Sequence, residues 1–322
     1  MNIKLPGRPA PFSMLGAGRQ FAILMSFFLT GLVLFSIVGV LCIVWIGHVS
    51  IYDIQGMNDY SNPALVLGLK VAQIISSVGT FILPALAFAF FVSDSPAGYL
   101  QIDRFGNVAV MLLGGLLMWC AVPLINYLAA LNSHLSLPSF MSSIEQWMKD
   151  SEQKADALTN AFMEHQTISG LILNLFMIGL LAAFCEELFF RATLQKIMIQ
   201  WTRNVHAGIW ITGALFSFLH FEFYGFLPRM LMGVYLGYLF LWSESLWVSV
   251  FAHFLNNATA VVFAFFEERT IVPKDSDQIG SDSSQVVYVL ISSVLVALLL
   301  LLIYRIGNNR KKAEIAEFTP QE

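Results

Sequence analysis

Long apolar stretches recur along this chain, and they limit its fold more than any other feature. They lie at about residues 21–46, 71–92, 108–131, 168–190, 207–221, 227–242, 246–266 and 286–306. An α-helix of about 20 apolar residues crosses the hydrocarbon core of a bilayer and satisfies its own backbone hydrogen bonds there. The sequence therefore predicts an all-α polytopic membrane protein with about eight transmembrane helices, of which the fifth and sixth are short for a full crossing.

The composition agrees with this class. Hydrophobic residues make up 57% of the chain and charged residues 12%, whereas soluble domains average roughly 45–50% and about 25%. The net charge of −4 comes without a basic block, so we expect the lipid bilayer as a partner and no nucleic acid. Cys42, Cys120 and Cys185 lie within apolar stretches without a paired spacing, so no disulfide framework is expected.

The distribution of basic residues predicts the orientation in the membrane. One set of loops and ends carries eleven of them: Lys4, Arg8, Arg19, Arg104, Arg191, Lys196, Arg203, Arg305, Arg310, Lys311 and Lys312. The opposite, longer loops carry five: Lys149, Lys154, Arg229, Arg269 and Lys274. By the positive-inside rule, both termini of a multi-pass protein in the plasma membrane are expected to be cytoplasmic. The first span has no evident small-residue cleavage site, so we expect a retained helix and not a signal peptide.

The segment 132–167 is the longest polar stretch of the chain. Apolar residues recur in it at roughly helical spacing: Leu137, Phe140, Ile144, Trp147 and Met148. This pattern fits an amphipathic helix along the outer membrane surface, and it fits an ordinary solvated loop helix equally well. Lys70, at the edge of the second span, can extend its ammonium group to the interface and is weak evidence for a site.

Charged residues inside the apolar stretches point to a functional site. A charged side chain at the bilayer centre costs at least about 2.5–3.5 kcal/mol, so such groups are retained where they face a protein interior or a wet cavity. Glu187 and Arg191 are four residues apart in the order that favours an ion pair within a helix. The neighbouring Glu186 then points about 100° away around the helix and stays available. Alternatively, both acids are interfacial caps that lipid headgroups solvate.

Polar residues on the following spans complete the set. Phe216 and His220 are one helical turn apart and share a face, and the same holds for His253 and Asn257. Each pair alone could be structural, because such side chains also link transmembrane helices by hydrogen bonds. Together with the two acids, they predict a buried reaction centre on three neighbouring helices.

Two chemistries use these side chains. In a metal-free hydrolysis of an amide, Glu186 would take a proton from water and His220 would hold that water. His253 and Asn257 would then donate hydrogen bonds to the developing oxyanion. Alternatively, Glu186, His220 and His253 could hold Zn²⁺ or another divalent metal with an open position for water. The chain has no H-E-x-x-H motif, and the spacing does not decide between the two chemistries.

The three motifs resemble the signature of a known family. In chain order they read E-E-x-x-x-R at 186–191, F-x-x-x-H at 216–220 and H-x-x-x-N at 253–257. This ordered set on successive apolar spans resembles the CPBP family of intramembrane proteases. That family includes CAAX prenyl endopeptidases, hence the term CAAX protease-like, and bacteriocin-processing and immunity-associated members. The resemblance covers about residues 165–268.

The resemblance implies a peptidase of the glutamate type or the metallo type. In the glutamate type, which we favour and which needs no cofactor, Glu186 and His220 activate water. His253 and Asn257 stabilise the oxyanion. The remaining motif residues would brace the site: Glu187, Arg191 and Phe216. Nothing in the sequence indicates that the substrate is prenylated.

We therefore expect an intramembrane endopeptidase that cleaves a membrane-associated peptide or protein. Three units are expected: an N-terminal three-span region over 1–164, a catalytic helix core over 165–268, and a last span with a cytoplasmic tail over 269–322. A non-catalytic membrane scaffold or immunity-type member of the same family is one alternative, although it would not need every catalytic position. A polytopic transporter also retains intramembrane charges, but it would be expected to show repeated halves with broken helices, and none is evident.

Overall fold

The computed structural model describes residues 10–54, 60–134, 137–164, 167–272 and 278–318, and every regular element in these ranges is a helix. The all-α polytopic class is thereby confirmed. The first elements are α1 (Ala17–Gly47), α2 (Ile51–Ile54), α3 (Pro63–Ser77), η1 (Val78–Ile82), α4 (Leu83–Val92), α5 (Pro96–Leu100), α6 (Val108–Ser133), η2 (Ser139–Met141) and α7 (Ser142–Met163). The remaining ones are α8 (Ile168–Asn174), η3 (Leu175–Leu181), α9 (Ala182–Phe189), η4 (Phe190–Gln195), α10 (Lys196–Thr202), α11 (Val205–Phe218), α12 (Phe226–Ser243), α13 (Leu246–Glu268), η5 (Ser283–Gln285) and α14 (Val286–Phe318).

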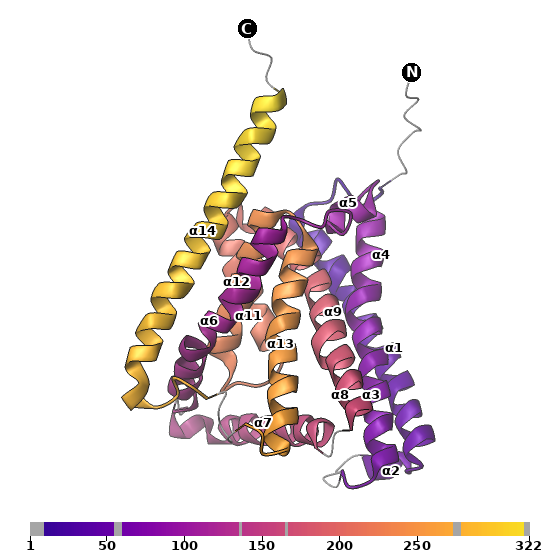
Figure 1. Ribbon diagram of the computed structural model, residues 1–322. Coiled ribbons are helices and arrows are strands. Elements are labelled where there is room, and N and C mark those ends of the chain that lie inside the picture. The colour runs from indigo at the N-terminus through magenta and orange to yellow at the C-terminus, as the bar shows by residue number, and fades with distance from the viewer. Residues whose placement is uncertain (1–9, 55–59, 135–136, 165–166, 273–277, 319–322) are drawn as a thin grey trace.

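Six helical segments of the described ranges are long and apolar enough to cross a membrane. They are Ala17–Gly47, Pro63–Val92, Val108–Ser133, Ile168–Thr202, Leu246–Glu268 and Val286–Asn309. The fifth and sixth predicted spans correspond to α11 and α12, which are not among these six, and α11 has only 14 residues. Both lie within the bundle, where α12 packs against α6 and α13 (Figure 1).

The fourth span is longer than predicted. The prediction of a loop over 191–206 is wrong for most of its length, because the helix continues to Thr202. Two π-helical segments, η3 and η4, flank α9 within it, and such segments are frequent at functional sites. Arg191, which the orientation argument counted as a loop charge, is buried in η4.

The second span also begins earlier than predicted. Helix α3 starts at Pro63, where the side chain of Asn62 caps it by accepting from the backbone N–H groups of Ala64 and Leu65. Lys70 consequently lies within the helix, two turns from its start, and its side chain is buried. Its buried side chain within the helix distinguishes Lys70 from an ordinary lysine at the membrane interface.

Helix α7 crosses one end of the bundle roughly at right angles to the spans (Figure 1). Its apolar side chains Ile144 and Trp147 are exposed, as is Phe140 just before it, which fits the predicted amphipathic helix on a membrane surface. Helix α1 begins and α14 ends at the opposite end of the bundle (Figure 1). The first and last described helices therefore start and end on one side of the bundle, as predicted, while the compartment on that side stays a prediction. Three residues of the charge count lie outside the described residues: Lys4, Arg8 and Lys274.

Close packing of α11 against α12 sets the position of the second motif. A Cβ on Gly213 would lie 2.9 Å from Val234 Cγ2 and 3.0 Å from the Met230 carbonyl oxygen. Only a glycine therefore allows the two helices to approach this closely, in the way that small residues do in membrane bundles. An aromatic core lies beside this contact and joins α1, η1, α9, η4 and α11: Phe28, Phe81, Phe189, Phe190 and Phe216.

Candidate active site

A buried ion pair forms the base of the site. Arg191 Nε donates to Glu187 Oε2 at 3.0 Å, and neither side chain is exposed. The guanidinium carbon also lies 5.0 Å from the centroid of the Phe216 ring, an arrangement that stabilises a cation in an apolar setting. Its Nη1 and Nη2 have no hydrogen-bond partner among the described residues. The predicted pair within one helix is thus present, and Phe216 covers it.

His253 binds the other oxygen of the same carboxylate. Its Nδ1 lies 3.1 Å from Glu187 Oε1, and the ring is buried. A carboxylate can only accept, so we assign the proton to Nδ1 and infer that this nitrogen donates. The ring's Nε2 lies 3.8 Å from Glu186 Oε2. Glu187 therefore orients the imidazole of α13 toward the second acid of α9.

His220 approaches Glu186 from the end of α11. Its Nδ1 lies 2.8 Å from the Phe216 carbonyl oxygen, which can only accept, so Nδ1 again carries the proton. Its ring packs edge to face on Phe216, with the centroids 4.8 Å apart. The Nε2 atom lies 3.9 Å from Glu186 Oε2. The structure therefore brings one carboxylate and two imidazole Nε2 atoms together from α9, α13 and the turn that follows α11.

The Glu186 carboxylate lies between the two imidazoles. Its side chain is 17% exposed and that of His220 is 29% exposed, so solvent-sized molecules can reach this point although the ion pair below is sealed. The distances of 3.8 and 3.9 Å are too long for direct hydrogen bonds. A single water molecule can bridge polar atoms at such distances.

Asn257 is bonded to residues outside the three motifs. Among the described residues, its hydrogen bonds run to Ile178 and Asn256 and not to Glu186 or the imidazoles. Asn257 Nδ2 donates to the Ile178 carbonyl oxygen at 3.0 Å, and Asn256 Nδ2 donates to Asn257 Oδ1 at 3.2 Å. The contact with Ile178 joins α13 to the π-helical segment η3. One N–H of the Asn257 amide is therefore engaged, and the second is not used in these two bonds.

Contacts that the sequence did not predict hold the segment 219–225 that carries His220. Asn132 Nδ2, at the end of α6, donates to the Phe223 carbonyl oxygen at 2.7 Å. The backbone N–H of Tyr224 donates to Glu152 Oε2 of α7 at 3.2 Å, and the Trp147 and Phe223 rings are 5.4 Å apart. Of these contacts, the sequence indicated only that Trp147 belongs to the apolar face of a helix, through its periodic spacing.

The histidines resemble metal ligands in one respect. Both imidazoles donate through Nδ1 and direct Nε2 at the site, which is the usual arrangement of histidine ligands. Nevertheless, the described residues contain no group of three His, Cys, Asp or Glu side chains arranged to hold a metal ion. The donor types therefore fit zinc, but their placement does not.

Comparison with known proteins identifies the segment that contains the site. Residues 168–259 match the family model described as type II CAAX prenyl endopeptidase Rce1-like. A protein of Bacillus subtilis (strain 168), named uncharacterized protein YpbD, is 30% identical over 98 residues, which are 29% of this chain and 47% of that protein. The chain thus spans about half the length of the curated relative that it matches. No solved structure matches. The matched segment contains all three motifs, and this match supports a relationship to the CPBP, or CAAX protease-like, family.

Proposed function

We propose that the protein is an intramembrane endopeptidase that hydrolyses a peptide bond of a membrane-associated peptide or protein. One observation carries the proposal: Glu186 Oε2 lies within 3.9 Å of the Nε2 atoms of both His220 and His253. A carboxylate is the group that can accept a proton from water, and an imidazole can accept or donate at the same point. The family match over residues 168–259 supports the reaction class.

The charges of the site suggest how the protons are arranged. Glu186, Glu187 and Arg191 together carry one net negative charge when all three are ionised. Uncompensated charge in a low-dielectric setting is costly, and an imidazolium form of His253 would neutralise it. That ring lies between the two carboxylates, 3.1 Å from Glu187 Oε1 and 3.8 Å from Glu186 Oε2. In this form it donates from both ring nitrogens.

The hydrolysis follows from this arrangement. A water molecule donates one hydrogen bond to Glu186 and the other to the unprotonated Nε2 of His220, and its lone pair attacks the carbonyl carbon of the substrate. Glu186 takes the water proton as the bond forms. The Nε2–H of His253 donates to the oxyanion in a site largely closed to solvent, where such a bond is strongest. When the tetrahedral intermediate collapses, Glu186 returns the proton to the leaving amine.

Asn257 is proposed as the second oxyanion donor. The amide N–H not bonded to Ile178 is free for this role, and Asn257 lies one helical turn from His253 on α13. A zinc-dependent reaction would instead use Glu186, His220 and His253 as ligands. We favour the metal-free form because an uncharged amide is a poor zinc ligand.

The first step of the test is to identify the natural substrate. Membrane proteins of cells that carry the wild-type protein or Glu186→Ala are compared by mass spectrometry, and fragments that depend on Glu186 define the cleavage site. The purified Glu186→Gln variant should then cleave that substrate about 10²–10⁴-fold more slowly, because the amide keeps the shape but cannot take the proton. Glu244→Gln, at the far end of α12 in an exposed ion pair with Arg104, is the matched control. Cleavage by Glu186→Gln at the wild-type rate would refute the assignment of the base, and no fragment difference in any preparation would favour the scaffold alternative.

A further inference from the structure

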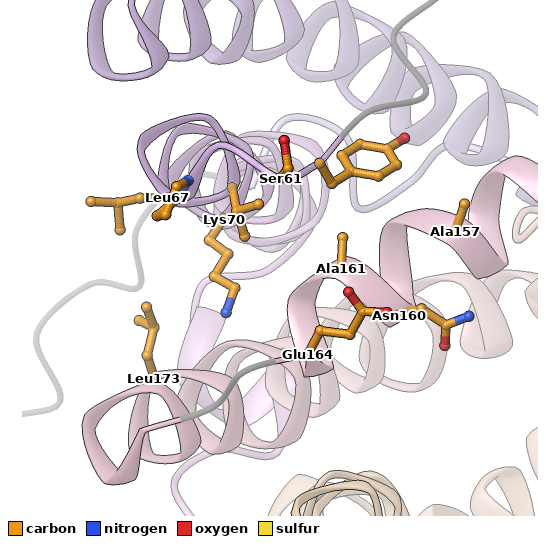
Figure 2. Close-up of a pocket in the computed structure, with 11 residues that line it drawn as sticks. Ser61, Leu67, Lys70, Ala157, Asn160, Ala161, Glu164 and Leu173 are labelled. Carbon is orange, nitrogen blue, oxygen red and sulfur yellow. The ribbon is translucent and has the colours of Figure 1, made fainter. Parts of the chain in front are cut away.

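A polar cavity lies away from the candidate active site, between α3, the end of α7 and the end of α8 (Figure 2). It has a volume of about 750 Å³. One of its lining residues, Leu173, precedes Glu186 by 13 residues along the same helical span. At 1.5 Å per residue this separation is roughly 20 Å. The cavity is therefore not an extension of the proteolytic site.

Lys70 supplies a buried cation to this cavity. The residue is only 8% exposed, and its Nζ donates to the Phe162 carbonyl oxygen at 3.0 Å and lies 5.6 Å from the centroid of the Phe162 ring, which is its aromatic contact. An ammonium group has three N–H donors, and one carbonyl uses one of them. Lys70 forms no ion pair within the part of the chain that the structure describes. A buried cation without a counter-charge is costly, so the cavity is suited to an occupant that brings a negative charge.

The opposite wall of the cavity carries an amide and a carboxylate. Figure 2 shows Lys70 reaching from α3, while Asn160 and Glu164 come from the end of α7 across the cavity. The Glu164 residue is exposed. The cavity thus has a cation on one wall and a carboxylate on the other. An occupant that carries both a negative and a positive group would match both walls, whereas a plain anion would match only one.

The position of the cavity suggests that its occupant also has an apolar part. Helix α7 lies across the end of the bundle (Figure 1), at the level where lipid headgroups meet the protein. Apolar side chains complete the lining, and one of them, Leu67 on α3, is 46% exposed on the surface of a span. An acyl chain can follow that surface while its headgroup enters the cavity.

We propose that this cavity binds the headgroup of a phospholipid with a primary ammonium, of the phosphatidylethanolamine type. The Lys70 ammonium donates to the lipid phosphate, and the Glu164 carboxylate accepts from the lipid ammonium. Asn160 offers an amide to either group. The bound lipid joins α3 to the end of α7, two elements that the bond between Lys70 and Phe162 already connects. This proposal does not depend on proteolytic activity.

The test measures lipid binding to the full-length protein by native mass spectrometry in a mild detergent. Phosphatidylethanolamine, phosphatidylglycerol and inorganic phosphate are added separately. We expect one tightly bound phosphatidylethanolamine, and about tenfold or greater weakening in Lys70→Met, which keeps the apolar stem but removes the charged donor. Lys149→Met is the control, because Lys149 is an exposed α7 residue paired with Glu145 and does not line the cavity.

Two further variants make the result specific. Glu164→Gln should bind phosphatidylethanolamine and phosphatidylglycerol about equally, because the group that recognises the ammonium is lost. Ala161→Phe should block lipid binding by filling the cavity while leaving the bond between Lys70 and Phe162 in place. If Lys70→Met does not fold, lipid binding by Ala161→Phe tests the proposal instead. Wild-type binding in Lys70→Met or Ala161→Phe would overturn the proposal. If inorganic phosphate binds as tightly as phosphatidylethanolamine, the cavity is a free-phosphate site, and the lipid assignment is overturned.

Discussion

At the scale of single residues, the site depends on Glu187 more than on any other side chain. Its two oxygens bind Arg191 at 3.0 Å and His253 at 3.1 Å, and all three groups are buried. Removing one member of a buried charged pair typically costs about 3–5 kcal/mol because the partner is left unpaired. The bracing role expected for Glu187 and Arg191 thus has a physical basis in the geometry. It also leaves Glu186 as the acid that faces the two imidazole Nε2 atoms.

Replacement of Asn257 tests the proposed oxyanion donor. Asn257→Ala should lower kcat about 10²–10³-fold with little change in KM, since an oxyanion donor acts mainly in the transition state. The cleavage kinetics of the purified variant measure this effect. Asn126→Ala, which removes an amide of α6 that donates to the Ile279 carbonyl oxygen, is the control. If Asn257→Ala keeps its kcat but unfolds at a lower temperature, the amide serves only to hold η3 through Ile178.

Removal of metal ions separates the two mechanisms that share these residues. We expect the purified enzyme to retain its activity after exhaustive chelation, because the proposed reaction uses Glu186 as the base and His253 as a donor. Bound metal is measured on the same sample by elemental analysis. Activity that disappears with the metal and returns with stoichiometric zinc would establish a metalloprotease with activated metal-bound water.

At the scale of elements, α7 is connected to the segment 219–225 that carries His220. Burial raises the pKa of Glu152, and the nearby carboxylates Asp156 and Glu222 raise it further, against a hydrogen bond from the Tyr224 N–H that lowers it. Burial likewise raises the pKa of Asp156, with Glu222 adding to the effect. Glu222 is itself paired with Arg229. Like charges therefore gather where the amphipathic helix α7 meets the segment 219–225.

The raised pKa values predict how stability changes with pH. A carboxyl group whose pKa is raised by folding binds its proton more tightly in the folded state, so the folded state loses stability as pH rises from the unfolded-state value through the raised value. Asp156→Asn removes one of these charges. It should raise the thermal unfolding temperature by a few degrees at most near pH 7, and the gain should vanish near pH 4, where the carboxyl groups are protonated.

A thermal-shift titration in detergent measures this difference between the wild type and Asp156→Asn. Asp150→Asn serves as the control, since Asp150 lies on the same helix and accepts from Gln146. A gain that is equal at pH 4 and pH 7 would show that charge repulsion is not its cause.

At the scale of the whole molecule, the helices form one bundle with its first and last spans starting and ending on the same side (Figure 1). The burial of Arg191 removes one residue from the predicted cytoplasmic charge count, which leaves ten against five. The sign of the asymmetry is unchanged. Both termini are still expected in the cytoplasm, with α7 on the outer surface.

Reporter fusions test this orientation. A reporter joined after Arg310 should be active in the cytoplasm, and one placed within residues 150–160 of α7 should be active outside. Phosphatase and fluorescent-protein reporters, which work on opposite sides of the membrane, give a matched pair of readings at each position. Because α1 begins and α14 ends on the same side of the bundle, an external reading after Arg310 with a cytoplasmic reading in α7 would mean that the orientation in the membrane is inverted.

The sequence by itself determined the features that depend on local spacing. Apolar runs predicted helices because a backbone in lipid must bond within its own segment, and the spacing of Glu187 and Arg191 predicted their pair because four residues make nearly one turn. Only the tertiary structure decided which distant groups meet. The bond from His253 to Glu187, the bond from Asn257 to Ile178, and the placement of Lys70 against Phe162 all join separate helices. Arg191 shows the reason most directly: the predicted span ended at residue 190 and the charge count treated Arg191 as a loop charge, but a carboxylate and an aromatic ring beside it make burial within a continuous helix favourable.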